Sequence, residues 1–167
     1  MTKGTAHEAL VSEIEKVFMP LARSKGFGVD TSEMPDFLVF RRFCEYRVDL
    51  FDIQWDKYDR PRFVINFGTC PGEGLTLRGK HIPADQMVAS WTTGGGRLQP
   101  GRGKTTSAWF RQDKPYLARI WNWRGKTYTP EEVVARLVAL FPELEAFWHD
   151  GRVGPHLHIQ PAPVPRA

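Results

Sequence analysis

The sequence predicts an α+β fold, with one antiparallel sheet of about four to six strands and helices packed on one face. Three observations lead to this prediction. An amphipathic helix opens the chain, three strand patterns with short links follow it, and a capped helix lies near the carboxyl end. Short links favour antiparallel neighbours, because parallel neighbours need long crossover connections.

The first helix is predicted from its apolar spacing and from the residues that end it. Gly26 follows a basic last turn, where helices commonly end. Pro20 lies near that turn and is expected to kink the helix, because proline has no N–H to donate. Apolar residues recur at intervals of three and four: Leu10, Ile14, Val17, Phe18 and Leu21.

Three strands are predicted at 37–43, 46–55 and 62–67. The second pattern is apolar on both faces, with Val48 and Leu50 on one side and Phe51 and Ile53 on the other. Two apolar faces indicate a central strand, or a bulge that switches the buried side.

The chain then becomes rich in glycine and proline over 68–103. A long loop inside a compact domain is usually functional or disordered. A short helix is predicted at 84–91, and one or two further strands are predicted within 109–123.

The last helix carries the clearest local signal. Thr129 is a good N-cap, Pro130 suits the first helical position, and Glu132 completes a capping box. Pro142 is expected to break or restart this helix. Residues 1–150 are therefore interpreted as a single α+β domain, and the Pro-rich residues 151–167 as a loosely held C-terminal tail.

Length and composition limit the class of protein. A chain of 167 residues forms a core large enough to fold without a disulfide framework, and Cys44 and Cys70 are its two cysteines. The chain opens with no apolar signal run, and no stretch approaches a membrane span. We expect a cytoplasmic protein with buried thiols and no membrane association.

Positive charge is concentrated in the segment 97–126. The segment holds eight Lys or Arg and one acidic residue, Asp113, whereas the whole chain is only +4. This pattern predicts an anionic partner, with arginines and lysines on phosphates and tryptophans on bases. The predicted polyanion-binding residues are Arg97, Arg102, Lys104, Arg111, Arg119, Arg124 and Lys126, and the predicted stacking residues are Trp109, Trp121 and Trp123. The alternative is that the tryptophans line the core, which is their commoner position.

Residues 101–106 end like a phosphate-binding loop, but the rest of that motif is missing. The spacing requires glycine where Leu98 stands, and neither an apolar strand nor an amphipathic helix flanks the loop. We expect no nucleotide hydrolysis here, although Arg102 and Lys104 remain able to contact phosphate.

Asp49 is the single candidate for a catalytic residue, because it shares a strand face with Phe51 and Ile53. A buried carboxylate is either paired or has a raised pKa, and both states serve acid–base chemistry. An ion pair with Arg41, Arg42 or Arg47 is the favoured alternative. Its neighbour Asp52 is expected to face solvent or a turn.

The histidines supply too few ligands for a metal. His156 and His158 share a face of an extended segment, and His149 precedes them, whereas zinc usually takes three or four ligands. We expect no metal and no cofactor.

The order of motifs resembles the small bacterial proteins grouped as domain of unknown function 4304. The resemblance rests on Met19-Pro20-Leu21 with Lys25-Gly26-Phe27, on the strand at 37–42, and on 63–68. It covers residues 8–148, and the Gly-rich segment 68–103 departs from it most. It implies a compact α+β fold and a cytoplasmic bacterial protein, but no activity, cofactor or site residue.

We therefore expect a non-enzymatic binding protein that contacts an acidic protein or nucleic acid through the segment 97–126. The settings considered are toxin neutralisation and defence against phage. One alternative is an enzyme that acts on a phosphate-containing substrate, with Asp49 as base or metal ligand. Another is a structural or oligomer-forming role through exposed aromatics such as Trp55 and Trp148. The oligomeric state is not predicted.

Overall fold

An antiparallel sheet forms the centre of the computed structural model, which describes residues 3–30, 36–102, 108–113 and 127–160. Six of its strands follow the order β1-β2-β3-β4-β7-β9, and β8 pairs with β4 beside β7. Within the described residues the sheet thus has seven strands, and the predicted α+β fold is confirmed. The strands are β1 Gly28–Asp30, β2 Phe37–Phe43, β3 Arg47–Trp55, β4 Arg62–Pro71, β7 Gly96–Leu98, β8 Phe110–Arg111 and β9 Leu157–Ile159.

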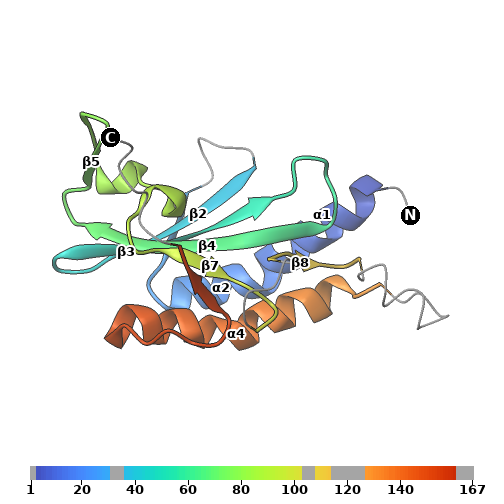
Figure 1. Ribbon diagram of the computed structural model, residues 1–167. Coiled ribbons are helices and arrows are strands. Elements are labelled where there is room, and N and C mark those ends of the chain that lie inside the picture. Colours follow the sequence, from blue (N-terminus) through green and yellow to red (C-terminus); the bar gives the residue numbers. More distant parts are fainter. Residues whose placement is uncertain (1–2, 31–35, 103–107, 114–126, 161–167) are drawn as a thin grey trace.

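The α-helices of the described residues lie on one face of this sheet (Figure 1). They are α1 Lys3–Glu13, a π-helical turn η1 Ile14–Phe18, α2 Met19–Ser24 and the long α4 Pro130–Asp150. No helix in the described part of the chain is long and apolar enough to cross a membrane. The core between helices and sheet is largely aromatic, and its fully buried members include Phe18, Phe40, Phe51, Phe63, Phe67 and Phe141.

The predicted disturbance at Pro20 takes the form of the π turn that directly precedes α2, in which Pro20 occupies the first turn. Proline cannot donate the backbone hydrogen bond that a continuous α-helix requires, so the preceding turn widens. Leu10, Ile14 and Phe18 remain buried through this change.

The helix α4 begins with the predicted capping box. The Glu132 N–H donates to Thr129 Oγ1 at 3.2 Å, and the Thr129 N–H donates to Glu132 Oε2 at 2.9 Å. The predicted break at Pro142 is wrong, because α4 continues to Asp150. The apolar stripe holds both halves against the sheet: Val134, Leu137, Phe141, Leu144 and Trp148 are buried, whereas Pro142 is exposed.

The other face of the sheet is partly covered by residues 72–95, which leave β4 and return as β7 (Figure 1). This excursion contains the hairpin β5 Leu75–Leu77 and β6 Lys80–Ile82, and two 3₁₀ turns, η2 Ala84–Gln86 and η3 Ala89–Trp91. Met87 is fully buried against β3 and β4 in a second, smaller core. The strand β3 is therefore covered on both faces, as its two apolar faces predicted.

The predicted helix at 84–91 is wrong, because an extended stretch separates η2 from η3. Met87 has ψ of 141°. Its carbonyl accepts hydrogen bonds from Arg41 Nε at 3.0 Å and Nη2 at 2.9 Å. A buried guanidinium thus takes the carbonyl that a continuous helix would use for its own ladder.

Part of the segment interpreted as a C-terminal tail is a strand of the sheet. β9 pairs with β7, and Leu157 is buried. His156 anchors the segment, since its Nδ1 lies 2.5 Å from Glu143 Oε1 and its carbonyl accepts from the Gln99 N–H. These contacts override the local proline content, so the tail interpretation does not hold for residues 151–160. Residues 161–167 lie outside the described part.

We predict that Thr129→Ala lowers the free energy of unfolding by about 1 kcal/mol, because the Glu132 N–H loses its side-chain acceptor. Urea denaturation followed by circular dichroism measures the change. Thr127→Ala is the matched control on an exposed neighbour, and equal losses in both variants would contradict the capping role.

Candidate functional site

A row of polar side chains crosses the sheet on the face opposite the helices. Asp52 of β3 lies opposite Asn66 of β4, Asn66 lies opposite Arg97 of β7, and Arg97 lies opposite His158 of β9. Directly opposed residues share a face, because side chains alternate along each strand. Four strands thus contribute one polar residue each at the same level.

The Asn66 carboxamide connects the members of this row. Its Nδ2 donates to Asp52 Oδ1 at 2.7 Å and to Gln54 Oε1 at 3.2 Å, and its Oδ1 accepts from Arg97 Nε at 3.0 Å. A guanidinium only donates hydrogen bonds, so the oxygen of the amide has to face Arg97. The nitrogen consequently faces Asp52, which must accept.

Asp52 is fully buried, contrary to the expectation that it faces solvent or a turn. Burial raises its pKa to about 6, although the hydrogen bonds from Asn66 and from the Ala89 N–H and the charge of Arg97 act to lower it. The expectation failed because the excursion lies over this face, and Ala89 belongs to its turn η3. The Asp52 carboxylate therefore holds η3 to the sheet.

Two glycines allow the excursion to lie directly on β4. A Cβ on Gly68 would stand 1.9 Å from Thr92 Oγ1, and a Cβ on Gly95 would stand 2.2 Å from the Phe67 carbonyl oxygen. Neither contact is sterically possible without movement of the chain. These glycines set how closely residues 92–95 approach the sheet.

The excursion and the sheet enclose a cavity of about 910 Å³, which we call the large cavity. Asn66, Gln54 and Arg97 line it from the sheet, and Arg78 and Lys80 line it from the hairpin. Among the described residues its lining contains three cations and no Asp or Glu. The remaining polar lining consists of hydroxyls and amides, from Ser90, Thr92, Thr93 and Gln160.

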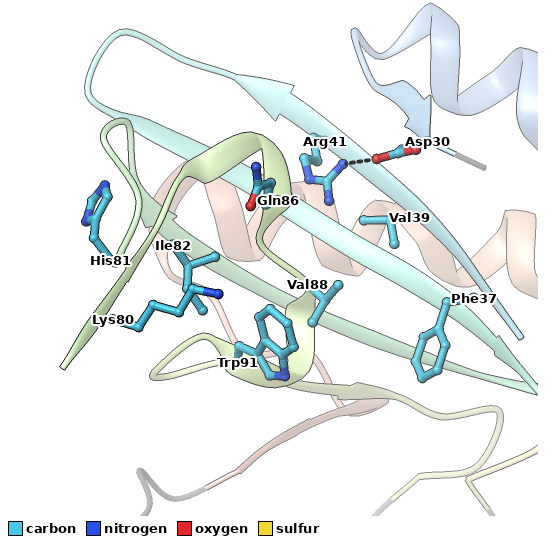
Figure 2. Close-up of a pocket in the computed structure, with 10 residues that line it drawn as sticks. All are labelled: Asp30, Phe37, Val39, Arg41, Lys80, His81, Ile82, Gln86, Val88 and Trp91. Carbon is cyan, nitrogen blue, oxygen red and sulfur yellow. Dashed lines mark hydrogen bonds and ion pairs between the residues drawn. The ribbon is translucent and has the colours of Figure 1, made fainter. Parts of the chain in front are cut away.

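A small cavity of about 150 Å³ lies on the same side of the sheet (Figure 2). Lys80, Ile82 and Trp91 line both cavities, so the two adjoin. In Figure 2 the polar ends of Gln86 and Arg41 lie above the apolar side chains at its centre. Its apolar lining is Phe37, Val39, Ile82, Val88 and Trp91.

Of the predicted polyanion-binding residues within the described part of the chain, the structure places only Arg97 in the lining of the large cavity. Arg97 lines the large cavity, whereas Arg111 lies opposite Arg62 on the same sheet face, roughly 13 Å farther along β4. Arg111 has Asp113 at 4.0 Å, and Arg102 is exposed beyond β7. Lys104, Arg119, Arg124 and Lys126 lie outside the described residues.

The predicted stacking residues are also not gathered into one site within the described residues. Trp109 is half-buried, and the Arg62 guanidinium covers its ring at 4.4 Å from the centroid. That contact occupies one face of the ring, so Trp109 is less available for a base than predicted. Trp121 and Trp123 lie outside the described residues.

Asp49 lies on the helix side of the sheet and is fully buried. It forms ion pairs with Arg42 at 3.0 Å and Arg47 at 2.9 Å. The favoured alternative, an ion pair with an arginine of the sheet, is therefore confirmed. The enzyme hypothesis loses its base, because two guanidinium groups neutralise Asp49 and the large cavity is on the opposite face.

The aromatics proposed for an oligomer surface are not exposed. Trp148 is 2% exposed, and its Nε1 donates to the Gly68 carbonyl at 3.1 Å. Trp55 is half-buried between His7 and Phe63. The predicted exposure of Trp148 was therefore wrong, and an oligomer-forming role stays a prediction.

The C-terminal histidines have separate environments. His156 is tied to Glu143, whereas His158 faces the polar row and its buried Nε2 has no hydrogen-bond partner among the described residues. Within that same part of the chain, no three His, Cys, Asp or Glu side chains gather closely enough to hold a metal ion.

Sequence reasoning missed most of this site, namely Asp52, Asn66, Arg78, Lys80 and Trp91. The available signal was the unusually long Gly-rich segment, which was recognised as a functional or disordered loop. Asn66 also interrupts an otherwise apolar strand, between Ile65 and Phe67.

Comparisons with known proteins found no match, whether with protein-family models, with curated proteins or with solved structures. The resemblance to domain of unknown function 4304 stays a prediction. We therefore infer the function from the geometry of the site.

We predict that Asp52 makes the protein more stable as the pH falls from 6 towards 4. Its pKa is about 6 in the folded protein and about 4 in the unfolded chain, so folding takes up a proton in this window. The free energy of unfolding is expected to rise by up to about 3 kcal/mol, as the difference between the two pKa values implies. Asp56, whose pKa is lowered to about 2, acts in the opposite direction at pH below 4.

Urea unfolding at several pH values measures this effect, and Asp52→Asn is the comparison. The difference in unfolding free energy between wild type and Asp52→Asn should change with pH between 6 and 4. A difference that stays constant over this window would show that Asp52 titrates alike in both states.

We predict that Asp49→Asn costs roughly 2–3 kcal/mol of stability, because the buried side chain no longer neutralises Arg42 and Arg47. The expected loss is below that of a fully buried pair, since the Arg47 side chain is 47% exposed. Chemical denaturation tests this, with Asp150→Asn as the exposed control. Equal stability of Asp49→Asn and wild type would contradict a structural role for Asp49.

Proposed function

We propose that this chain is a non-enzymatic binding protein that holds phosphate groups of a single-stranded nucleic acid in the large cavity. The observation that carries the proposal is the charge of the lining: Arg78, Lys80 and Arg97 line the cavity, and none of them forms an ion pair with a carboxylate among the described residues. Asp52 lies behind Asn66 and acts on Arg97 only through the charge interaction that lowers the Asp52 pKa. Three unpaired cations around one cavity favour an anionic ligand.

Arg97 is held in place for this role. Its Nε donates to Asn66, so the orientation of the guanidinium is restrained before a ligand arrives. Restrained donors bind at a lower cost in conformational entropy than free ones. The outer Nη groups of Arg97 have no hydrogen bond within the described residues, which leaves them for phosphate oxygens.

Trp91 favours a nucleic acid over an acidic protein. The side chain is 40% exposed and lines the same cavity as the three cations. An aromatic ring beside cations is the arrangement by which proteins hold single strands, with bases on the ring and phosphates on the charges. The hydroxyls and amides of the lining suit phosphate and sugar oxygens.

The lining offers little for catalysis. Among the described residues it contains no Asp, Glu, His or Cys, which are the common acid–base groups and nucleophiles. Asp52 has both carboxylate oxygens engaged by donors behind Asn66. The contacts predicted from the sequence for Arg102, Lys104, Arg111, Arg119, Arg124 and Lys126 stay part of the proposal.

Fluorescence anisotropy with a labelled single-stranded oligonucleotide, titrated at several salt concentrations, tests this function. We predict that Lys80→Gln and Arg97→Gln each lower the affinity and reduce the slope of log K against log salt by about 0.7, one lost phosphate contact each. Arg152→Gln is the matched control, because Arg152 is exposed and paired with Asp150 at the end of α4.

A labelled polyglutamate peptide is the competing probe in the same assay. Preference for the peptide would replace nucleic acid by an acidic protein as partner. Binding that does not respond to salt, or that Arg152→Gln weakens as much as Lys80→Gln, would exclude the proposed site.

A further inference from the structure

The small cavity beside the phosphate site has the volume of one six-membered ring. It measures about 150 Å³, and an engineered protein cavity of that volume, lined by apolar side chains, holds benzene. A pyrimidine base is a single six-membered ring with polar edges, whereas a purine has two fused rings. The volume therefore favours a pyrimidine.

The lining combines apolar side chains with five polar ones, which are Asp30, Arg41, Lys80, His81 and Gln86. Val39 and Val88 are buried and supply apolar contact, and Trp91 supplies an aromatic ring. Gln86 contributes a carboxamide, which both donates and accepts, and its side chain has no hydrogen bond within the described residues. A carboxamide matches the neighbouring donor and acceptor of a pyrimidine edge.

The two cavities are close enough to hold one nucleotide together. Lys80, Ile82 and Trp91 form their shared wall, so a ligand in one cavity lies beside a ligand in the other. Lys80 places its ammonium at this junction, where the phosphate of a nucleotide would lie next to its sugar. Arg41, which also lines the small cavity, is already bound to Asp30 and to the Met87 carbonyl.

From this arrangement we infer that the protein recognises a pyrimidine nucleotide, with the base in the small cavity and the phosphate in the large one. The inference rests on the proposed function and adds a preference for one class of base. A free nucleotide and a nucleotide within a strand present the same chemistry, and the experiment separates them.

Isothermal titration calorimetry at low salt compares five probes: inorganic phosphate, thymidine 5′-monophosphate, deoxyadenosine 5′-monophosphate, and octamers of thymidine and of deoxyadenosine. We predict roughly tenfold tighter binding of the thymidine form, because a base that fits gains stacking and edge contacts that a purine misses. If the protein prefers thymidine 5′-monophosphate over deoxyadenosine 5′-monophosphate, a free nucleotide is sufficient for recognition. Preference among octamers alone identifies a strand, and both results support the inference.

Gln86→Leu tests the small cavity separately from the phosphate site. The side chain is exposed, so the variant is expected to fold, and it removes the edge contacts at similar size. The tenfold preference should fall below about threefold, while affinity for inorganic phosphate is unchanged. Gln160→Leu is the matched control for the thymidine preference. Gln160 is exposed and lines the large cavity but not the small one, so this variant should keep the preference.

The outcomes separate this inference from the function on which it rests. Equal binding of the two octamers, with losses in Lys80→Gln and Arg97→Gln, overturns the pyrimidine preference and leaves the phosphate site standing. A preference that Gln86→Leu does not change also overturns it. No salt-dependent binding of any octamer overturns both.

Discussion

The fold is constrained by the need to cover both faces of β3 and β4. Phe51 and Phe67 face the helices, and Leu50 and Asn66 face the opposite side, yet all four are buried. The helices α1, α2 and α4 cover the first face with an aromatic core. The second face is partly covered by the excursion at 72–95, which forms a smaller apolar core over Val48 and Leu50 and leaves polar groups beneath it elsewhere. Those groups have to satisfy one another, because a buried polar atom without a partner is costly.

Asn66 meets that requirement and also orients the guanidinium of Arg97. An amide has one donating and one accepting end, so it can join a carboxylate to a guanidinium without leaving either unsatisfied. The same contacts place the titratable carboxylate of Asp52 beneath a residue that lines the large cavity.

The sequence predicted the fold far better than the site, and the reason is the range of the interactions. Periodic apolar residues and the Thr129 cap are local signals, so the first and last helices and the strands β2, β3 and β4 were predictable. The C-terminal strand depends on His156 reaching Glu143, and the turns η2 and η3 depend on Arg41 reaching Met87, and no local pattern reports such contacts. For the same reason Arg97 was recognised by its charge, whereas Arg78 and Lys80 were overlooked in a hairpin that contributes little to local charge density. Asp49 and Asp52 have similar sequence neighbourhoods. They differ because they point to opposite faces of β3, where Asp49 meets two arginines and Asp52 meets an amide and a backbone N–H.

One face of the sheet holds the aromatic core and the other holds the cavities, and this separation has an evolutionary consequence. Residues 72–95 make the walls of both cavities but add nothing to the aromatic core on the helix side. Substitutions at exposed positions of this excursion can therefore alter the lining of the cavities while the aromatic core on the helix side is unchanged. A lineage descended from such a protein would be expected to diversify fastest in that stretch, while retaining small residues at Gly68 and Gly95 where any excursion must cross the sheet.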